Sequence, residues 1–336
     1  MKTNDLPKEI FLAACKFNLL NPSIGYSSRK ITDGVSSDIW HVKTQNKKEF
    51  CIKRALGKLA VKEDWFAPVD RNNFEAMYFN YCNRFSPDCF PNILGHDKKN
   101  YILAMEWFNE IDHKIWKSKL LKKKVDLLDA KNISTLLSRK HKFFFNKNFF
   151  KKKFENDKTF FAIRIEPYII FTSKKYPDYK KDFIDVAQSL VDNKKTLIHG
   201  DFSPKNILIK SNNPIILDAE TACWGDPVFD LAFCNNHLLL KSFLPNYPGK
   251  DYIKMSYEFI NNYISNISWE DKSSFIERFI KILPLLLLAR IDGKSPVEYF
   301  SQKEQRHTRD LAKYILDTKV NNIIQLYSIL YNHVKK

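Results

Sequence analysis

The sequence has no apolar run long enough to cross a membrane. Its longest apolar run, Ile282 to Ala289, is interrupted by Pro284, whereas a transmembrane helix needs about 20 apolar residues. Residues 1–9 carry no basic stretch leading into an apolar core, so we predict neither a signal peptide nor membrane insertion. With 44% hydrophobic and 28% charged residues, the composition is that of a soluble globular protein.

The sequence also lacks the paired cysteines of a zinc site. Its six cysteines form no Cys-x-x-Cys pair, and their spacing matches no zinc-ligand pattern. Most lie in apolar contexts such as Phe50-Cys51-Ile52, which predicts buried free thiols. Because free thiols persist in a reducing compartment, we expect a cytoplasmic protein.

Glycine is scarce, and basic residues clearly outnumber acidic ones. The chain has 8 glycines, and its 55 Lys and Arg residues exceed its 38 Asp and Glu residues, giving a net charge of +17. One interpretation is an anionic partner, such as nucleic acid, a membrane surface or a phosphorylated substrate. The other is compositional drift, because Lys, Asn, Ile, Phe and Tyr are the residues that AT-rich codons favour. The lysines form no continuous stripe, so we expect no specific nucleic-acid binding; the oligomeric state stays open.

The hydrophobic pattern predicts an α+β fold with a small β-rich lobe and a larger helical lobe. The expected early elements are a helix at Leu6–Leu20, two strands within Ile31–Thr44, a strand at Glu49–Ala55, a helix at Asp70–Arg84 capped by Asp70, and two strands within Asn92–Met105. Beyond Glu110 helices predominate, with three short strands between Thr196 and Asp218. We therefore predict lobes at residues 1–108 and 109–336, with a Lys- and Phe-rich helical insert at about 112–165. Clefts between lobes are common ligand sites.

The clearest chemical pattern lies between Leu197 and Glu220. A predicted strand ends in His199-Gly200-Asp201, Asn206 follows, and a second strand ends in Asp218-Ala219-Glu220. Phosphoryl transfer needs one carboxylate to orient the attacking hydroxyl and hard oxygen ligands to hold Mg²⁺ against the phosphates. Asp201 fits the first role. Asn206 and Asp218 fit the second, and Glu220 offers another carboxylate near the metal.

These residues resemble the aminoglycoside phosphotransferase and choline kinase superfamily over roughly residues 25 to 300. His199-Gly200-Asp201 with Asn206 is similar to its catalytic loop, which parallels the His-Arg-Asp loop of protein kinases. Asp218-Ala219-Glu220 resembles the Asp-x-Glu of choline kinases and methylthioribose kinases. The resemblance implies a two-lobed protein-kinase-like fold. It also implies an enzyme that uses ATP and Mg²⁺.

The resemblance also implies supporting roles around the catalytic loop. His199 is expected to hold the loop, not to transfer a proton. Asp230, within Gly225-Asp226-Pro227-Val228-Phe229-Asp230, corresponds to an Asp that supports the loop from a helix in this family. Asp226 by itself is interpreted as the N-cap of that helix.

In the N-terminal lobe the resemblance implies nucleotide contacts. Lys53 resembles the lysine that contacts the α- and β-phosphates, and Glu75 on the following helix offers the partner that a buried lysine needs to stay charged. The segment Glu106-Trp107 ends the last small-lobe strand, where this fold offers backbone hydrogen bonds to adenine.

The segment at Asp33-Gly34 is the weakest match to the family. It contains one glycine where protein kinases have three, but its Asp-Gly turn resembles the corresponding loop of methylthioribose kinase. Gly34, Ser36 and Ser37 are candidates to cradle phosphate through backbone N–H and hydroxyl groups. The alternative is an ordinary hairpin turn.

Two further stretches resemble an uncharacterised bacterial branch of these phosphotransferases, namely residues 67–72 and 289–296. In the second stretch, Arg290 and Asp292 are candidates for substrate contacts. The alternative is a helix C-terminus closed by Gly293.

The sequence therefore predicts an ATP-dependent phosphotransferase acting on a hydroxyl of a small molecule. A sugar such as methylthioribose, an amino alcohol and an already anionic metabolite stay open, whereas a chain at +17 suits a polycationic aminoglycoside poorly. The alternative is a catalytically inactive kinase-like protein that binds nucleic acid or an anionic surface. The intact set of Lys53, Asp201, Asn206 and Asp218 favours the enzyme.

Overall fold

The computed structural model describes residues 6–32, 36–59 and 65–334, and it divides into two compact units. The first unit comprises the chain up to His113 together with Ile215–Thr221, and the second comprises Lys114–Pro214 and the chain from Ala222 onward. The division after His113 lies close to the predicted boundary at residue 108. Sequence order does not reveal that Ile215–Thr221 belongs with the first unit.

A five-stranded antiparallel sheet forms the framework of the first unit. Its strand order is β1-β2-β3-β5-β4, where the strands are β1 (Tyr26–Ile31), β2 (Ser37–Thr44), β3 (Glu49–Ala55), β4 (Ile93–Asp97) and β5 (Ile102–Glu106). Strands β3, β4 and β5 confirm the predicted segments. The prediction was wrong for β1, which ends at Ile31 where the predicted strand began. This edge strand, Tyr-Ser-Ser-Arg-Lys-Ile, is mostly polar and gives almost no hydrophobic alternation.

The two helices of the first unit use different faces of this sheet. Helix α1 (Lys8–Lys16) packs through Ile10 and its neighbours against alternate side chains of the strands, including Trp40, Phe50 and Ile52. Lys53 is one residue out of phase with Ile52, so its side chain points to the other face, where it meets Glu75 of helix α2 (Arg71–Phe85). Both helices were predicted, although α1 is shorter than expected.

The predicted cap of α2 is not formed. Asp70 occupies the N-cap position, but its backbone is already helical and its side chain makes no capping hydrogen bond. A capping side chain needs an extended backbone at this position to reach the free N–H groups of the first turn. The contrast is Asp226, which has that extended backbone and accepts a hydrogen bond from the Val228 N–H, as predicted.

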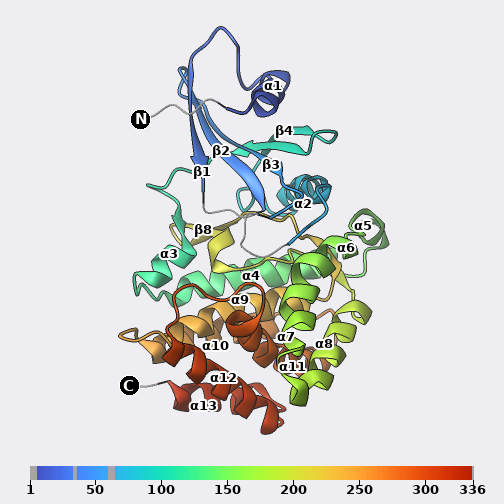
Figure 1. Cartoon of the computed structure of the whole chain (residues 1–336), viewed down its shortest axis with the longest axis vertical. Coiled ribbons are helices and arrows are strands. Elements are labelled where there is room, and N and C mark those ends of the chain that lie inside the picture. Colours follow the sequence, from blue (N-terminus) through green and yellow to red (C-terminus); the bar gives the residue numbers. More distant parts are fainter. Residues whose placement is uncertain (1–5, 33–35, 60–64, 335–336) are drawn as a thin grey trace. The chain divides into compact units, whose positions relative to one another are not determined.

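The second unit is mainly helical (Figure 1). Its α-helices are α3 (Trp116–Leu121), α4 (Leu127–Phe144), α5 (Asn148–Lys153), α6 (Asp157–Phe160), α7 (Phe171–Ser173), α8 (Lys180–Asp192), α9 (Pro227–Ser242), α10 (Gly249–Ser265), α11 (Lys272–Asp292), α12 (Gln302–Asp317) and α13 (Ile323–His333). A π-helix, η1 (Phe161–Ile170), and two 3₁₀ turns, η2 (Pro177–Tyr179) and η3 (Pro204–Asn206), complete the set.

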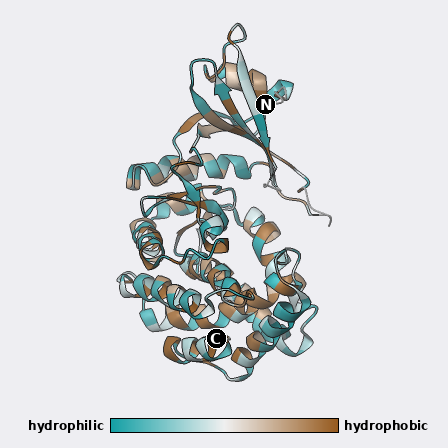
Figure 2. Ribbon diagram, turned by 90° about the vertical axis from the view of Figure 1, so that its left-hand side faces the viewer, coloured by the Kyte–Doolittle hydropathy of each residue, from teal (hydrophilic) through white to brown (hydrophobic). Residues whose placement is uncertain are grey.

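Helix α9 lies at the centre of this unit. Nearly all of its residues are buried, and it packs against α10 and α11. Figure 2 shows hydrophobic and hydrophilic residues alternating along the helices, as expected where one face of a helix is buried. In the described part of the chain, no helix is long and apolar enough to span a membrane. All six cysteines are free thiols, as predicted, but only Cys82, Cys223 and Cys234 are buried, so the expected burial was wrong for the other three.

Short strands carry the predicted catalytic segment. Strand β7 (Thr196–Ile198) pairs antiparallel with β10 (Cys223–Gly225). Strands β6 (Lys114–Ile115), β8 (Ile207–Lys210) and β9 (Asn213–Ile216) form a sheet in the order β6-β8-β9. The three strands predicted between Thr196 and Asp218 are thus confirmed as β7, β8 and β9. Asp201 and Asn206 lie between β7 and β8, and Asp218 follows β9.

Candidate functional site

Asp201 is a buried carboxylate held by three donors within the second unit. Its side chain is nearly inaccessible, with 4% of the residue exposed. Arg164 Nη2 lies 2.9 Å from Oδ1, Lys205 Nζ lies 3.0 Å from Oδ2, and Asn206 Nδ2 donates to Oδ2 at 2.9 Å. Charged and amide donors of this kind fix both carboxylate oxygens in one orientation.

Asp230 fixes the backbone that carries Asp201. The N–H groups of His199 and Gly200 donate to the two oxygens of Asp230 at 2.7 and 2.8 Å. Gly200 has φ of 74°, a left-handed conformation that glycine adopts without strain. The Asp201 N–H in turn donates to His199 Nδ1 at 3.1 Å. These contacts place the Asp230 carboxylate and the His199 ring against the turn that carries Asp201.

Asp230 is itself part of a buried charged network. Lys140 Nζ lies 3.4 Å and His141 Nε2 3.2 Å from its Oδ2. Burial alone would raise the pKa of Asp230, but Lys140 and His141 hold that pKa below its usual value. Burial and the charge of Lys140 lower the pKa of His141 to about 4, so its ring is neutral at pH 7. The carboxylate therefore stays ionised beneath the loop.

Sequence reasoning missed Arg164. It lies on the π-helix η1 and also donates from Nε to the Gly200 carbonyl, so it contacts both the turn and the carboxylate of Asp201. The available signal was a single arginine within the largely apolar run Phe161–Ile170, because a buried arginine needs a partner. π-Helical turns are themselves frequent at functional sites.

The first unit contains a second charged cluster, centred on Lys53. Its Nζ lies 2.7 Å from Glu75 Oε2 and 2.8 Å from Asp218 Oδ1. Burial alone would lower the pKa of Lys53, but the carboxylates of Asp218, Glu75 and Glu220 raise it above the ordinary value. The expected pair of Lys53 with Glu75 is therefore present, and the amine is charged.

Burial shifts the pKa of Glu75 in the opposite direction. It raises the pKa of Glu75 to about 7, although Lys53 acts against that rise and Asp218 adds to it. Three carboxylates thus share the neighbourhood of one lysine. An additional cation at Asp218 would relieve their mutual repulsion.

Arg71 was also missed as a site residue, although its segment was noted. Its fully buried side chain donates from Nε to Glu220 at 3.1 Å. Its remaining guanidinium donors reach backbone carbonyls that include those of Ser36 and Leu56. Arg71 therefore connects Glu220 to Ser36, one of the residues predicted to cradle phosphate.

The remaining predicted nucleotide contacts are placed as follows. Gly34 lies outside the described residues. The Ser36 carbonyl accepts from Arg71 and from the Leu56 N–H, and Ser37 is buried at the start of β2. At the end of β5, the Glu106 N–H donates to the Asn92 carbonyl at 2.9 Å. The Trp107 ring stacks on His41 with ring centres 4.0 Å apart.

The two predicted substrate residues lie at the C-terminal end of α11 and differ in their contacts. Asp292 accepts from Arg309 Nε at 2.6 Å and from the Tyr176 hydroxyl at 2.5 Å, so its carboxylate is already engaged. Arg290 contacts the backbone and hydroxyl of Ser295 and has no carboxylate partner among the described residues. Helix α11 ends at Asp292, immediately before Gly293.

The oxygen donors fit a hard divalent cation to different degrees. Asp218 keeps 27% of its side chain exposed and has a left-handed backbone with φ of 62°, an uncommon conformation that often marks functional residues. Asn206 uses its amide nitrogen to bind Asp201, which leaves the carbonyl oxygen as the available donor. Glu220 is instead engaged by Arg71. Asp218 and Asn206 thus each present a donor of the kind that Mg²⁺ accepts.

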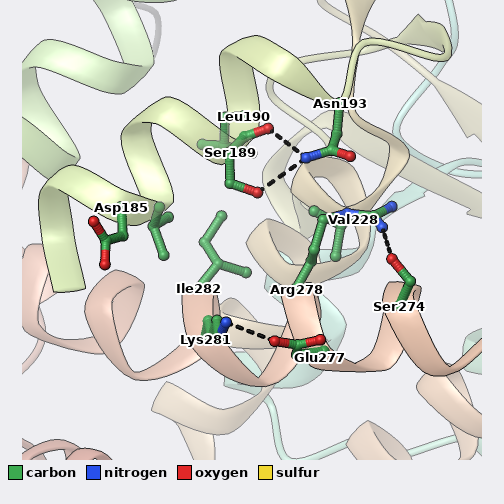
Figure 3. Close-up of a pocket in the computed structure, with 11 residues that line it drawn as sticks. Asp185, Ser189, Leu190, Asn193, Val228, Ser274, Glu277, Arg278, Lys281 and Ile282 are labelled. Atoms are coloured by element: carbon green, nitrogen blue, oxygen red, sulfur yellow. Dashed lines mark hydrogen bonds and ion pairs between the residues drawn. The ribbon is translucent and has the colours of Figure 1, made fainter.

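A surface cavity of about 260 Å³ lies elsewhere in the second unit, between α8, α11 and the start of α9 (Figure 3). Its polar side chains satisfy one another: Asn193 binds Ser189, Lys281 pairs with Glu277, and Arg278 donates to Ser274. None of the predicted site residues lines it. The cavity is therefore separate from the predicted catalytic residues.

Comparison with known proteins agrees with this geometry. Residues 172–246 match the phosphotransferase enzyme family. This segment includes His199, Asp201, Asn206, Asp218 and Asp230. The predicted resemblance to the family is confirmed.

Two curated relatives of this phosphotransferase-like chain are methylthioribose kinases. The protein from Yersinia enterocolitica is 23% identical over 56% of this chain and 53% of its own length. The protein from Pectobacterium atrosepticum is 23% identical over 65% of this chain and 61% of its own length. The chain thus spans only half to three fifths of these relatives.

A solved structure shows the fold over almost the whole chain. A choline/ethanolamine kinase family protein from Mesorhizobium loti superposes with a TM-score of 0.57 at 11% identity, covering 97% of this chain and 98% of its own. At this identity the likeness shows the fold alone. The predicted α+β, protein-kinase-like fold is confirmed.

Proposed function

We propose that this protein is an ATP-dependent kinase that transfers a phosphoryl group to a hydroxyl of a small molecule. The observation that carries the proposal is the Asp201 carboxylate, buried and oriented by Arg164, Lys205 and Asn206 at the end of β7. A carboxylate that only capped a turn would need none of these charged partners. The methylthioribose kinase relatives and the matched phosphotransferase family support the same reaction class.

The proposal assigns different tasks to the two clusters. In the first unit, Lys53 contacts the nucleotide phosphates and Glu75 keeps it in place. In the second unit, Asp201 accepts the proton of the attacking hydroxyl while the acceptor oxygen forms the new P–O bond and the bond to ADP breaks. Asp218 and Asn206 are the assigned Mg²⁺ ligands, and bound Mg²⁺ would neutralise charge on the phosphates.

The acceptor belongs to the small hydroxyl compounds. The relatives favour a sugar resembling methylthioribose, and the choline/ethanolamine kinase fold keeps an amino alcohol in the set to be tested. The six free thiols favour a reducing, cytoplasmic location.

The test is Asp201→Asn, which keeps the shape and hydrogen-bonding reach of the side chain but removes the proton acceptor. We expect kcat to fall roughly 10²- to 10⁴-fold, the usual contribution of general acid–base catalysis. ATP affinity should stay near wild type because Lys53 is untouched. Activity would first be found by ADP release over a panel of sugars, amino alcohols and aminoglycosides.

The matched control is Asp185→Asn on the exposed surface of α8, which should change neither quantity. Melting curves verify folding. A folded Asp201→Asn protein with near wild-type turnover would sink the proposed mechanism.

A further inference from the structure

Two buried cations in the second unit lack a carboxylate partner among the described residues. Arg290 is 8% exposed and Lys241 is 1% exposed. Arg290 contacts Ser295 and, at 3.5 Å, the Tyr168 hydroxyl, while its Nε is buried without a hydrogen-bond partner. Within the described part of the chain, Lys241 Nζ donates to the His237 carbonyl alone, at 2.9 Å, and lies 5.7 Å from the centre of the Tyr299 ring. The Tyr299 hydroxyl is also buried without a partner.

This arrangement is costly for the folded chain by itself. A buried charge without a counter-charge loses hydration and gains no ion pair in return. Lys241 shows the effect directly, because burial and the charges of Lys117 and Arg290 lower its pKa to about 7. An anionic ligand would supply the missing counter-charge.

The two cations belong to a larger basic group. Burial and the charges of Arg290, Lys241, Lys205 and Lys117 together hold the pKa of His237 well below its usual value. These four residues come from α11, α9, η3 and α3, so separate elements converge on one side chain. Helices α9 and α11 pack directly against each other.

The same group adjoins the Asp201 carboxylate. Lys205 pairs with Asp201 directly. Tyr168 contacts both Arg290 and Arg164, the arginine that pairs with Asp201. Its hydroxyl lies 3.5 Å from Arg290 Nη1, and its ring centre lies 5.8 Å from the Arg164 guanidinium carbon. Among the described residues, Arg164 and Lys205 pair with Asp201 and Lys117 pairs with the exposed Glu298, so Arg290 and Lys241 add two cations to this group. An acceptor positioned at Asp201 meets an excess of positive charge.

We propose that Arg290 and Lys241 form an anion-binding subsite beside Asp201, and that the acceptor is a hydroxyl compound carrying a phosphate or carboxylate group. This inference rests on the proposed kinase function and narrows its substrate class. The anion satisfies the two unpaired cations and the Tyr299 hydroxyl while the acceptor hydroxyl faces Asp201. A cationic amino alcohol would be repelled by the same residues.

The first experiment measures binding without turnover. Inorganic phosphate and acetate are titrated into the full chain by calorimetry, without nucleotide and at constant ionic strength set with sodium chloride. We expect phosphate or acetate to bind, and Arg290→Gln to weaken the stronger of the two about tenfold or more. The preferred probe distinguishes a phosphate-bearing from a carboxylate-bearing acceptor.

Two matched variants locate that binding. Lys53→Ala should leave it unchanged, because the described partners of Lys53 are Glu75 and Asp218, and Lys281→Gln removes an exposed lysine as a charge control. Affinity lost in Lys53→Ala but kept in Arg290→Gln would place the anion at the nucleotide phosphates and overturn the inference. Equal affinity in all variants, or no binding of either probe, would also overturn it.

Lys241→Met provides a test that does not depend on Arg290→Gln folding. The change keeps the unbranched stem of the side chain up to the position of Cε and removes an unpaired buried charge. We expect a higher melting temperature in probe-free buffer together with weaker anion binding. A lower melting temperature with unchanged anion binding would identify Lys241 as a structural residue and contradict the proposal.

Turnover separates this inference from the proposed function. Matched acceptors are ribose with ribose 5-phosphate, and glycerol with glycerol 3-phosphate and glycerate, with choline as the cationic member. We expect kcat/KM at least tenfold higher for an anionic member, and loss of that preference in Arg290→Gln. Preferred turnover of choline or a neutral sugar would keep the kinase and overturn the anion subsite. Anion binding that depends on Arg290, without phosphorylation of any acceptor, would keep the subsite and count against the kinase.

Discussion

The Arg164 guanidinium lies 2.9 Å from Asp201 Oδ1, and both side chains are buried. Arg164 also holds the Gly200 carbonyl, so one side chain fixes the carboxylate and the turn beneath it. A buried ion pair of this kind keeps its geometry because either partner alone would be an uncompensated charge. Arg164 is therefore a positioning residue for Asp201.

Arg164→Gln should lower kcat by about 10- to 100-fold, since small displacements of a catalytic group cost up to roughly 10² in rate. The Kd of ATP should stay near wild type. Arg164→Lys should recover part of kcat because it restores the charge but not the two-sided contact. Steady-state kinetics and nucleotide titration on the same preparations provide the measurement.

The control for that series is Lys181→Gln, which removes an exposed lysine paired with Asp185 on α8. It should leave kcat and melting temperature unchanged. If Arg164→Gln loses stability but keeps full kcat, Arg164 supports the fold without positioning Asp201.

Lys53→Ala should weaken ATP binding, and Glu75→Ala should do so to a lesser degree, because Asp218 still contacts Lys53 when Glu75 is absent. The double variant should lose much less than the sum of the two single losses. Residues in direct contact show coupling of about 0.5–3 kcal/mol in such cycles. ATP titrations of the four proteins measure it, and strictly additive losses would show that Glu75 does not act through Lys53.

ATP should raise the melting temperature more with Mg²⁺ than without it. The reason is that the oxygen atoms of Asp218 and Asn206 can bind phosphate oxygens only through a cation. Asp218→Asn should lose the metal-dependent part of the shift and keep the metal-free part. Mg²⁺ without nucleotide is the control, and identical ATP shifts with and without the metal would refute the ligand assignment.

Stability should rise with pH above about 7 through Lys241. Burial and its cationic neighbours lower its folded pKa to about 7 from the ordinary lysine value of 10.5. Between these pH values the unfolded chain holds a proton that the folded chain has released, so the free energy of unfolding increases with pH. Below pH 7 the Lys241 amine is protonated in both states, so the folded protein carries the full free-energy cost of a buried charge.

The difference between wild type and Lys241→Met isolates this contribution. Lys117, Arg290 and Glu298 also surround the amine, but they are common to both proteins. The variant should be more stable at pH 7 and below, and its advantage should shrink as the pH approaches 10. Urea unfolding at several pH values measures it; a constant difference across the range would mean that Lys241 does not titrate as described.

Local sequence determined much of the site before any packing was known. His199, Asp201 and Asn206 lie in a turn between two short hydrophobic strands, and the order of strand, turn and strand follows from that pattern alone. The likeness of Lys53 and Glu75 to family residues predicted their pairing across a strand and the next helix, and the structure contains it. These features depend on the spacing of residues that are close in the chain, and a single sequence is enough to show that spacing.

Beyond the Lys53–Glu75 pair, tertiary structure decided which charges neutralise one another. Arg164 reaches Asp201 from a π-helix, Arg71 reaches Glu220 from α2, and Asp70 fails to cap its helix although its residue type favours capping. Arg290 and Lys241, by contrast, end without carboxylate partners among the described residues. Ion pairing depends on distance and burial, and both arise only when segments far apart in the chain pack together. The sequence therefore determined the reactive groups, and packing decided which of them are held, buried or left for a ligand.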